Sequence, residues 1–285
     1  MKAIIGVYGS VSSHWVGDGF PVKSLFFYDQ LGEQISPFLL LDHAGPAQFA
    51  PTTKKRGVGV HPHRGFETVT IVYDGEVAHG DSVGNRGVIG AGDVQWMTAA
   101  RGILHEEYHS DQFAKEGGTL HMVQLWVNLP AQVKMSAPRY QAITNTDIPR
   151  LTLPNDAGLL RVIAGEYQAT QGAAKTYSAI NVWDMQLNAH KEVYLQSPAS
   201  HTTLLVVLEG EVTVNDEQVF GADKVLLFAK NDEQIKLVAH DDAKVLLLTG
   251  EPLNEPIVGQ GPFVMNTQAE IRQAFADYRE GRLGA

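Results

Sequence analysis

The segments DGEVAHGD (74–81) and GAGDVQWMTA (90–99) return in the second half of the chain as EGEVTVND (209–216) and GADKVLLFAK (221–230). In each copy a strand-like run precedes a Gly-Glu turn, and a turn rich in glycine and aspartate precedes the next strand-like run. Two β-barrel domains in tandem would produce this repeat. Two hairpin turns that resemble each other by chance would produce it as well.

Most of the chain before residue 267 is patterned as β-strand. Near the C-terminus, Thr267 and Glu270 form a capping box, apolar residues follow at helical spacing, and Gly281 can end the helix. We therefore expect an all-β fold of two tandem antiparallel β-barrels with a short C-terminal helix. The clearest expected strands are Ser24 to Phe27, Phe38 to Leu41, Thr68 to Tyr73, Met122 to Val127, Leu204 to Val207, Val225 to Phe228 and Val245 to Leu248.

The repeat and a weakly patterned stretch between its copies predict the domain bounds. We expect an N-terminal barrel over residues 1–130 and a connector over residues 131–154. A second barrel would follow over residues 155–253, and a tail with the helix would occupy residues 254–285.

Composition excludes several classes of function. The 285 residues include no cysteine, which excludes a disulfide scaffold, a thiol nucleophile, an iron–sulfur cluster and a thiolate zinc site. The net charge is −10 and no basic run exceeds residues 54–56, which disfavours direct binding of nucleic acid. No apolar run approaches the roughly 20 residues of a membrane helix, and the first residues do not resemble a secretory signal. We expect a cytoplasmic protein.

Two short histidine motifs could bind a metal. His61 and His63 stand at i and i+2, and so do His105 and Glu107, so that each pair can share one face of a strand. His190-Lys191-Glu192 has the same spacing as the second motif, so neither motif is specific alone. The first two, however, bracket one copy of the repeat. Three imidazoles and a carboxylate leave two positions of an octahedron open, which suits a redox-active divalent metal such as Fe(II) better than structural zinc.

The second copy of the repeat lacks these residues. Counted from the matching turns, the positions of the four candidate ligands fall on Gln196, Pro198, Lys236 and Val238. His240 is out of register, and we interpret it as a surface histidine. The second barrel is therefore expected to hold no metal.

The chain resembles the pirin family, which consists of bicupins of the cupin superfamily. The resemblance covers nearly the whole length and rests on four motifs. It implies two β-barrels that face each other, a metal in the N-terminal barrel alone, and a tail that packs back on that barrel. It also implies that the metal ligands are His61, His63, His105 and Glu107. Many cupins instead use a carboxylate at the position of Glu67, which we expect to be structural here. The motifs are HPHRGFETVT (61–70), GDVQWMTAARGILHEE (92–107), QLWVNLP (124–130) and GPFVMNT (261–267).

The activity that this resemblance implies is that of an Fe(II)-dependent quercetin 2,3-dioxygenase, with a flavonol and O2 as substrates. Glu107 would be the base that removes the proton of the flavonol 3-hydroxyl. One alternative is a redox-sensing iron protein without enzymatic activity, which regulates a transcription cofactor or a metabolic enzyme. Another is a purely structural pair of barrels. Two barrels that face each other in one chain favour a monomer.

Residues around the motifs have simpler expected roles. We expect Trp96 and Trp126 in the core, and His43 is a candidate for the approach to the metal. Arg64 and Gln124 are candidates for holding the outer N–H groups of the ligating imidazoles. The phosphate-loop, nucleophile-elbow and dinucleotide-turn motifs are all absent from the sequence. The remaining histidines are expected to be solvated or hydrogen-bonded: His14, His79, His109, His190, His201 and His240.

Overall fold

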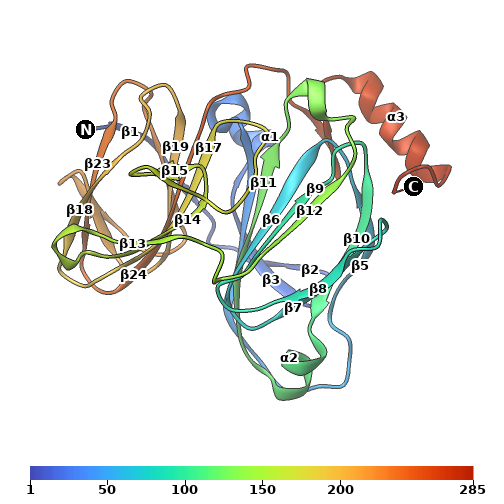
Figure 1. The fold of residues 1–285 in the computed structure, drawn as a ribbon, viewed down its shortest axis with the longest axis horizontal. Helices are drawn as coiled ribbons and strands as arrows, with labels where there is room; N and C mark the ends of the chain where they lie inside the picture. Colours follow the sequence, from blue (N-terminus) through green and yellow to red (C-terminus); the bar gives the residue numbers. More distant parts are fainter. Residues whose placement is uncertain (285) are drawn as a thin grey trace. The chain divides into compact units, whose positions relative to one another are not determined.

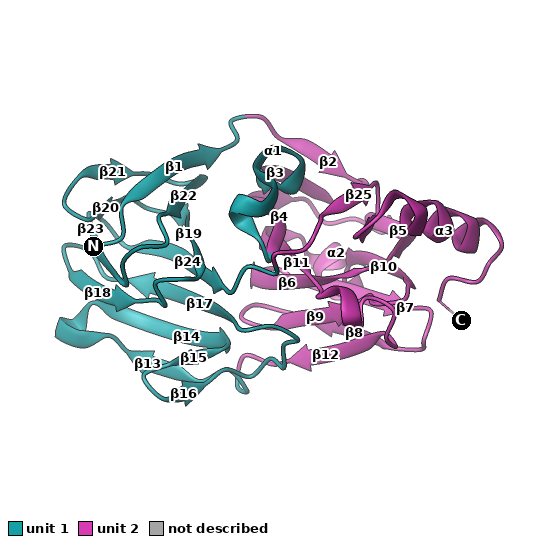
Figure 2. Cartoon of the chain, turned by 90° about the horizontal axis from the view of Figure 1, so that it is seen from above, with its two compact units in different colours: residues 1–11, 25–37, 146–253 teal, residues 12–24, 38–145, 254–285 magenta. Residues whose placement is uncertain are grey.

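The computed structural model describes residues 1–284, and the chain divides into two compact units. Unit 1 comprises residues 1–11, 25–37 and 146–253, and unit 2 comprises residues 12–24, 38–145 and 254–285 (Figure 2). Both units consist mainly of antiparallel β-strands (Figure 1).

Unit 1 contains a seven-stranded and a four-stranded sheet. The larger sheet has the order β1-β22-β19-β24-β17-β14-β13, and the smaller has the order β18-β23-β20-β21. A small hairpin, β15–β16, follows β14. The bounds are β1 (Ile4–Gly9), β13 (Arg150–Thr152), β14 (Gly158–Ala164), β15 (Glu166–Tyr167), β16 (Thr170–Gln171), β17 (Ile180–Leu187), β18 (Glu192–Gln196), β19 (Thr202–Glu209), β20 (Val212–Val214), β21 (Gln218–Phe220), β22 (Lys224–Phe228), β23 (Gln234–Ala239) and β24 (Ala243–Gly250).

Unit 2 also contains a seven-stranded and a four-stranded sheet, in the orders β12-β9-β6-β11-β4-β3-β2 and β5-β10-β7-β8. A hairpin, β25–β26, lies in its C-terminal segment. The bounds are β2 (His14–Val16), β3 (Phe20–Phe27), β4 (Phe38–Phe49), β5 (Gly57–His63), β6 (Phe66–Asp74), β7 (Val77–Asp81), β8 (Arg86–Ile89), β9 (Val94–Thr98), β10 (Ile103–His109), β11 (Gly118–Asn128), β12 (Arg139–Ile143), β25 (Val258–Gln260) and β26 (Phe263–Met265).

The two units match strand by strand, as internal duplication predicts. The sheet positions of β9, β6, β11, β4, β3 and β2 in unit 2 correspond to those of β22, β19, β24, β17, β14 and β13 in unit 1. In the smaller sheets, β5, β10, β7 and β8 of unit 2 correspond, in that order, to β18, β23, β20 and β21 of unit 1. This arrangement confirms the predicted tandem, all-β fold, and every expected strand lies within a strand of the structure.

The division of the chain differs from the expected bounds at the N-terminus. Residues 1–11 and 25–37 belong to unit 1, because β1 pairs with β22 and extends the larger sheet of that unit. The expected connector also contains sheet strands, since β12 pairs with β9 in unit 2 and β13 pairs with β14 in unit 1. Residues 254–285 belong to unit 2.

Each unit buries apolar side chains contributed by both of its sheets. In unit 1, Trp183 and Leu205 of the larger sheet share one core cluster with Leu195 and Ile235 of the smaller sheet. In unit 2 a corresponding cluster joins the larger sheet to Val77 and Ile89 of the smaller sheet. Burial of alternate residues on facing strands therefore holds each pair of sheets together.

The C-terminal helix is the longest helix in the described part of the chain. Helix α3 (Gln268–Arg279) begins at Thr267, whose hydroxyl oxygen accepts a hydrogen bond from the backbone N–H of Glu270 at 3.2 Å. Gly281 follows with a φ of 68°, as expected of a residue that ends a helix. Two shorter helices were not expected, α1 (Tyr28–Leu31) and α2 (Asp111–Glu116), and the latter is capped by Ser110. No helix in residues 1–284 is both long and apolar enough to cross a membrane.

Candidate metal centre

Strands β5 and β10 of unit 2 bring the two histidine motifs together (Figure 1). The strands are antiparallel neighbours, and His105 pairs directly with His61 while Ile103 pairs with His63. Because His61 and His63 are two residues apart, both can project to the same side of their strand. The pairing therefore places His105 beside His61 on the neighbouring strand, close to His63.

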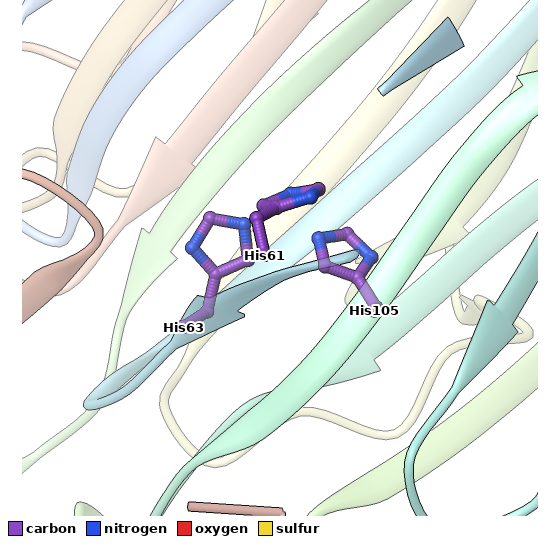
Figure 3. Close-up of side chains that lie close together, drawn as sticks. All are labelled: His61, His63 and His105. Atoms are coloured by element: carbon purple, nitrogen blue, oxygen red, sulfur yellow. The ribbon is translucent and has the colours of Figure 1, made fainter. Parts of the chain in front are cut away.

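The three imidazoles converge on one small space (Figure 3). One nitrogen from each of His61, His63 and His105 lies within 4.8 Å of the other two. The ring centroids are 4.2 Å apart for His61 and His105, 4.8 Å for His63 and His105, and 4.9 Å for His61 and His63. This spacing allows all three rings to bind one cation.

The ring nitrogens of this cluster are suited to metal binding. Burial, together with the charge of His61, lowers the pKa of His63 to about 3. Burial also takes the pKa of His105 well below its usual value, so both rings are neutral near pH 7 and carry a lone pair. Nδ1 of His63 and both nitrogens of His105 are buried without a hydrogen-bond partner among the described residues. Buried polar atoms without partners are rare and costly, and a cation would satisfy them.

Backbone carbonyls hold two of the rings from outside. Nδ1 of His61 lies 2.8 Å from the carbonyl oxygen of Gly59, so this nitrogen donates and Nε2 carries the lone pair. The ring of His63 hydrogen-bonds the carbonyl of Pro262, in the C-terminal segment of unit 2. Outer hydrogen bonds of this kind fix the orientation and the tautomer of ligating histidines.

Glu107 is buried beside this cluster but lies outside the 4.8 Å group of the three histidines. The side-chain amide of Gln124 donates to both carboxylate oxygens, with each N–O distance 3.1 Å. Burial raises the pKa of Glu107, although the nearby His61 and hydrogen bonds from Gln124 and Thr70 oppose the effect. The carboxylate is therefore held in a fixed position close to His61.

Trp126 lies at the site rather than only in the core, which corrects the expectation from sequence. Its ring packs against Phe66, with centroids 4.2 Å apart, and against His63, with centroids 5.4 Å apart. Trp126 follows Gln124 by two residues on β11, so that the alternation of the strand places both on one face. In the sequence, the Gln-x-Trp spacing of residues 124–126 is the pattern that places Trp126 on the same face as Gln124. Trp96, by contrast, is fully buried as expected.

Arg64 and Gln124 do not hold the outer nitrogens of the imidazoles, which also corrects the expectation. A guanidinium only donates hydrogen bonds, so it cannot accept one from an imidazole N–H. Arg64 instead donates from Nε to the carbonyl of Arg101 at 2.6 Å and from Nη1 to Asp277 at 2.7 Å. These contacts connect the end of β5 to helix α3.

Other histidines form separate contacts. Nε2 of His43 lies 2.8 Å from Nε2 of His121, and both side chains are buried outside the cluster. His79 bonds the hydroxyl of Tyr140, and His109 bonds the carbonyl of Gly19. The structure therefore places His43 in a buried histidine pair.

Glu67 is also outside the histidine cluster and forms a buried hydrogen bond of its own. Its Oε1 accepts from the hydroxyl of Thr98 at 2.6 Å, and Arg139 lies 4.0 Å away. Burial raises the pKa of Glu67 to about 7, against the opposing effects of Thr98 and Arg139. Because the folded pKa exceeds the unfolded value, this group favours folding at low pH and loses that contribution as the pH rises towards 7.

Glu67→Gln should remove this pH dependence. Between pH 5 and pH 8, the free energy of unfolding of the metal-free parent should fall by about 3 kcal/mol relative to that of the variant, since one pKa unit corresponds to about 1.4 kcal/mol. Urea unfolding at both pH values measures the difference. Glu106→Gln is the control, since Glu106 lies on a different strand, β10, and contacts Arg86. Parallel pH profiles for the parent and Glu67→Gln would contradict the assignment.

Comparison with known proteins finds two matching family models, one in each half of the chain. The family model described as Pirin matches residues 19–127, and the one described as Pirin C-terminal cupin domain matches residues 182–284. The chain belongs to the pirin family. All four candidate ligands fall within the first match, which shows that the candidate site lies in the N-terminal pirin region.

Individual relatives extend over nearly the whole chain. A Pseudomonas aeruginosa protein provisionally named a quercetin 2,3-dioxygenase is 59% identical over 282 residues, which cover 99% of this chain and 98% of that protein. A second protein of the same organism with the same provisional name is 40% identical over 259 residues, or 88% of each chain. The crystal structure of quercetin 2,3-dioxygenase from Acinetobacter baumannii superposes with a TM-score of 0.98 at 55% identity, and the match covers 100% of this chain and 99% of that chain.

Proposed function

We propose that this chain is a metal-dependent dioxygenase that acts on quercetin or a related flavonol. The observation that carries the proposal is the convergence of three imidazoles, of which His63 and His105 are buried and keep ring nitrogens without partners in the described residues. Relatives named as quercetin 2,3-dioxygenases support the choice of substrate. The substrates would be the flavonol and O2.

His61, His63 and His105 would hold the metal, with Glu107 as the fourth ligand. Imidazole and carboxylate donors without sulfur fit iron, and related sets of histidines and one carboxylate hold Fe(II) in oxygenases. We therefore infer Fe(II). When bound, the metal would supply Lewis acidity at the flavonol hydroxyl and the redox activity that reaction with O2 requires.

The proposed role of Glu107 is to take the proton of the flavonol 3-hydroxyl on one carboxylate oxygen. The amide of Gln124, 3.1 Å from both oxygens, would keep the carboxylate oriented as the proton moves. Trp126, whose ring packs on the fully buried Phe66, supplies an aromatic surface next to His63, against which a flat flavonol ring can stack. The residues of the chain thus position the substrate and accept its proton.

Glu107→Gln tests the proposal. Oxygen uptake by the Fe(II)-loaded parent with quercetin should match the quercetin consumed, and the variant should lose roughly 100-fold in rate because general-base catalysis contributes about that much or more. Glu106→Gln should leave the rate unchanged, because Glu106 contacts Arg86 on the opposite side of β10. No uptake by metal-loaded parent, or equal uptake by parent and Glu107→Gln, would refute the proposal.

A further inference from the structure

Unit 1 contains a cavity at the end that corresponds to the metal centre of unit 2. The cavity has a volume of about 730 Å3 and lies where β18 ends and β23 begins. These strands match β5 and β10, which carry the histidine cluster in unit 2. Gln196 and Gln234 form a direct cross-strand pair here, as His61 and His105 do there. A volume of this size lies within the range of roughly 300–1,000 Å3 that is typical of small-molecule sites.

The lining of this cavity is aromatic and amide-rich. Trp183 and Tyr167 pack edge to face with ring centroids 5.0 Å apart, and Tyr194 adds a third ring. The side-chain amides of Gln196 and Gln234 also line it, and no described residue hydrogen-bonds either amide. Each amide can donate two hydrogen bonds and accept others. Such a surface offers ring faces for stacking and several groups for hydroxyls.

One wall of the cavity is held rigidly by a hydrogen-bond network. Asn181 accepts from the backbone N–H of Glu166 at 2.9 Å and donates to the hydroxyl oxygen of Thr249 at 2.7 Å. Because that oxygen accepts from Asn181, the Thr249 hydroxyl is free to donate to Nδ1 of His201, 3.4 Å away. A Cβ at Gly165 would lie 2.0 Å from the Asn181 oxygen, so only glycine permits this close packing.

The charges around the cavity favour a neutral occupant. Glu166 is the only carboxylate in the lining, and no lysine or arginine of the described residues takes part in it. The ammonium group of Lys236 lies 5.8 Å from the centre of the Tyr194 ring, but it is paired with Asp216 and Glu192. An anionic ligand would therefore meet the Glu166 carboxylate and no unpaired cation. The buried indole nitrogen of Trp183 has no acceptor among the described residues, and an oxygen-bearing ligand could supply one.

We propose that this cavity is a metal-free binding site for an uncharged ring compound that carries several hydroxyl groups. Two sources share this chemistry, sugars and polyphenols. The site lies entirely within unit 1, so the inference does not depend on the function proposed for unit 2.

Calorimetric titration of the metal-free full-length protein tests the site. One titration series compares methyl glucoside with glucuronate, and the other compares catechol with a dihydroxybenzoate. Saturable binding of at least one neutral compound is expected, with its carboxylate partner at least about tenfold weaker. Binding of the sugar alone or of the phenol alone identifies the source, and either supports the site.

Two variants locate the binding. The double variant Gln196→Leu and Gln234→Leu should weaken binding at least about tenfold, because it removes the amides and keeps their approximate volume. Trp183→Phe provides a second test within the cavity, since it removes the indole N–H. His105→Ala should leave binding unchanged, which separates this site from the metal centre. Absence of saturable binding, equal affinity for the carboxylates, or binding that survives both cavity variants would overturn the proposal.

Discussion

The His105→Ala variant is expected to bind divalent metal at least about 1,000-fold more weakly than the parent and to lose flavonol turnover. His105 is only 2% exposed and both of its ring nitrogens lack partners in the described chain, so a bound cation would be its main polar contact. Loss of residues that merely support a metal ligand costs about 10–100-fold in affinity, and loss of the ligand itself should cost more. Thermal unfolding with and without metal measures the effect, because a ligand that binds only the folded state raises Tm.

His240→Ala is the matched control for this experiment. His240 is exposed in unit 1 and bonds the hydroxyl of Thr213, far in sequence from the candidate ligands. This variant should keep the Tm increase of the parent when metal is added. A comparable increase for His105→Ala would contradict the assignment of His105 as a ligand.

Asp277→Ala should destabilise unit 2 by about 3–5 kcal/mol, which is the usual cost of leaving a buried charge without its partner. Arg64 is 4% exposed, and Asp277 accepts its Nη1 hydrogen bond at 2.7 Å. Although burial raises the pKa of Asp277, hydrogen bonds from Arg282, Arg64 and Gln273 bring it down to about 2, so the pair is charged at neutral pH. Denaturant unfolding measures the loss, and metal affinity should fall too because Arg64 directly follows His63.

Arg272→Ala is the control for the loss of a charge from helix α3. Arg272 is exposed on the same helix and has no ion pair within residues 1–284. Its replacement should change the free energy of unfolding by less than about 0.5 kcal/mol. Equal stability of Asp277→Ala and Arg272→Ala would show that the Arg64 contact does not stabilise unit 2.

Local patterns in the sequence predict the strands and the C-terminal cap, but not every pairing. The Thr267 to Glu270 capping box depends on neighbouring residues, so it can be read directly from the chain. The pairing of β1 with β22 joins residues more than 200 positions apart, and nothing in the local sequence encodes that partner. For this reason the expected first domain included residues that belong to unit 1.

The candidate site was predictable in its side chains and less so in its backbone contacts. The i, i+2 spacing of His61 and His63 identified residues that the structure brings together with His105. The carbonyl of Pro262 beside His63 depends on a distant segment and on no side-chain identity. Counting along the chain also matched His105 to Lys236, whereas strand pairing makes Gln234 the cross-strand partner of Gln196. The two-residue offset arises because His105 is the third residue of β10, whereas Gln234 is the first residue of β23.

Labelling with 18O2 is the most direct test of a metal-dependent flavonol dioxygenase. Fe(II)-loaded protein would be incubated with quercetin under 18O2, and the product mass would be measured. Our account predicts two labelled oxygen atoms in the products of each turnover, and no turnover by His105→Ala. Unconsumed quercetin, or quercetin consumed with one labelled oxygen or none, would contradict it.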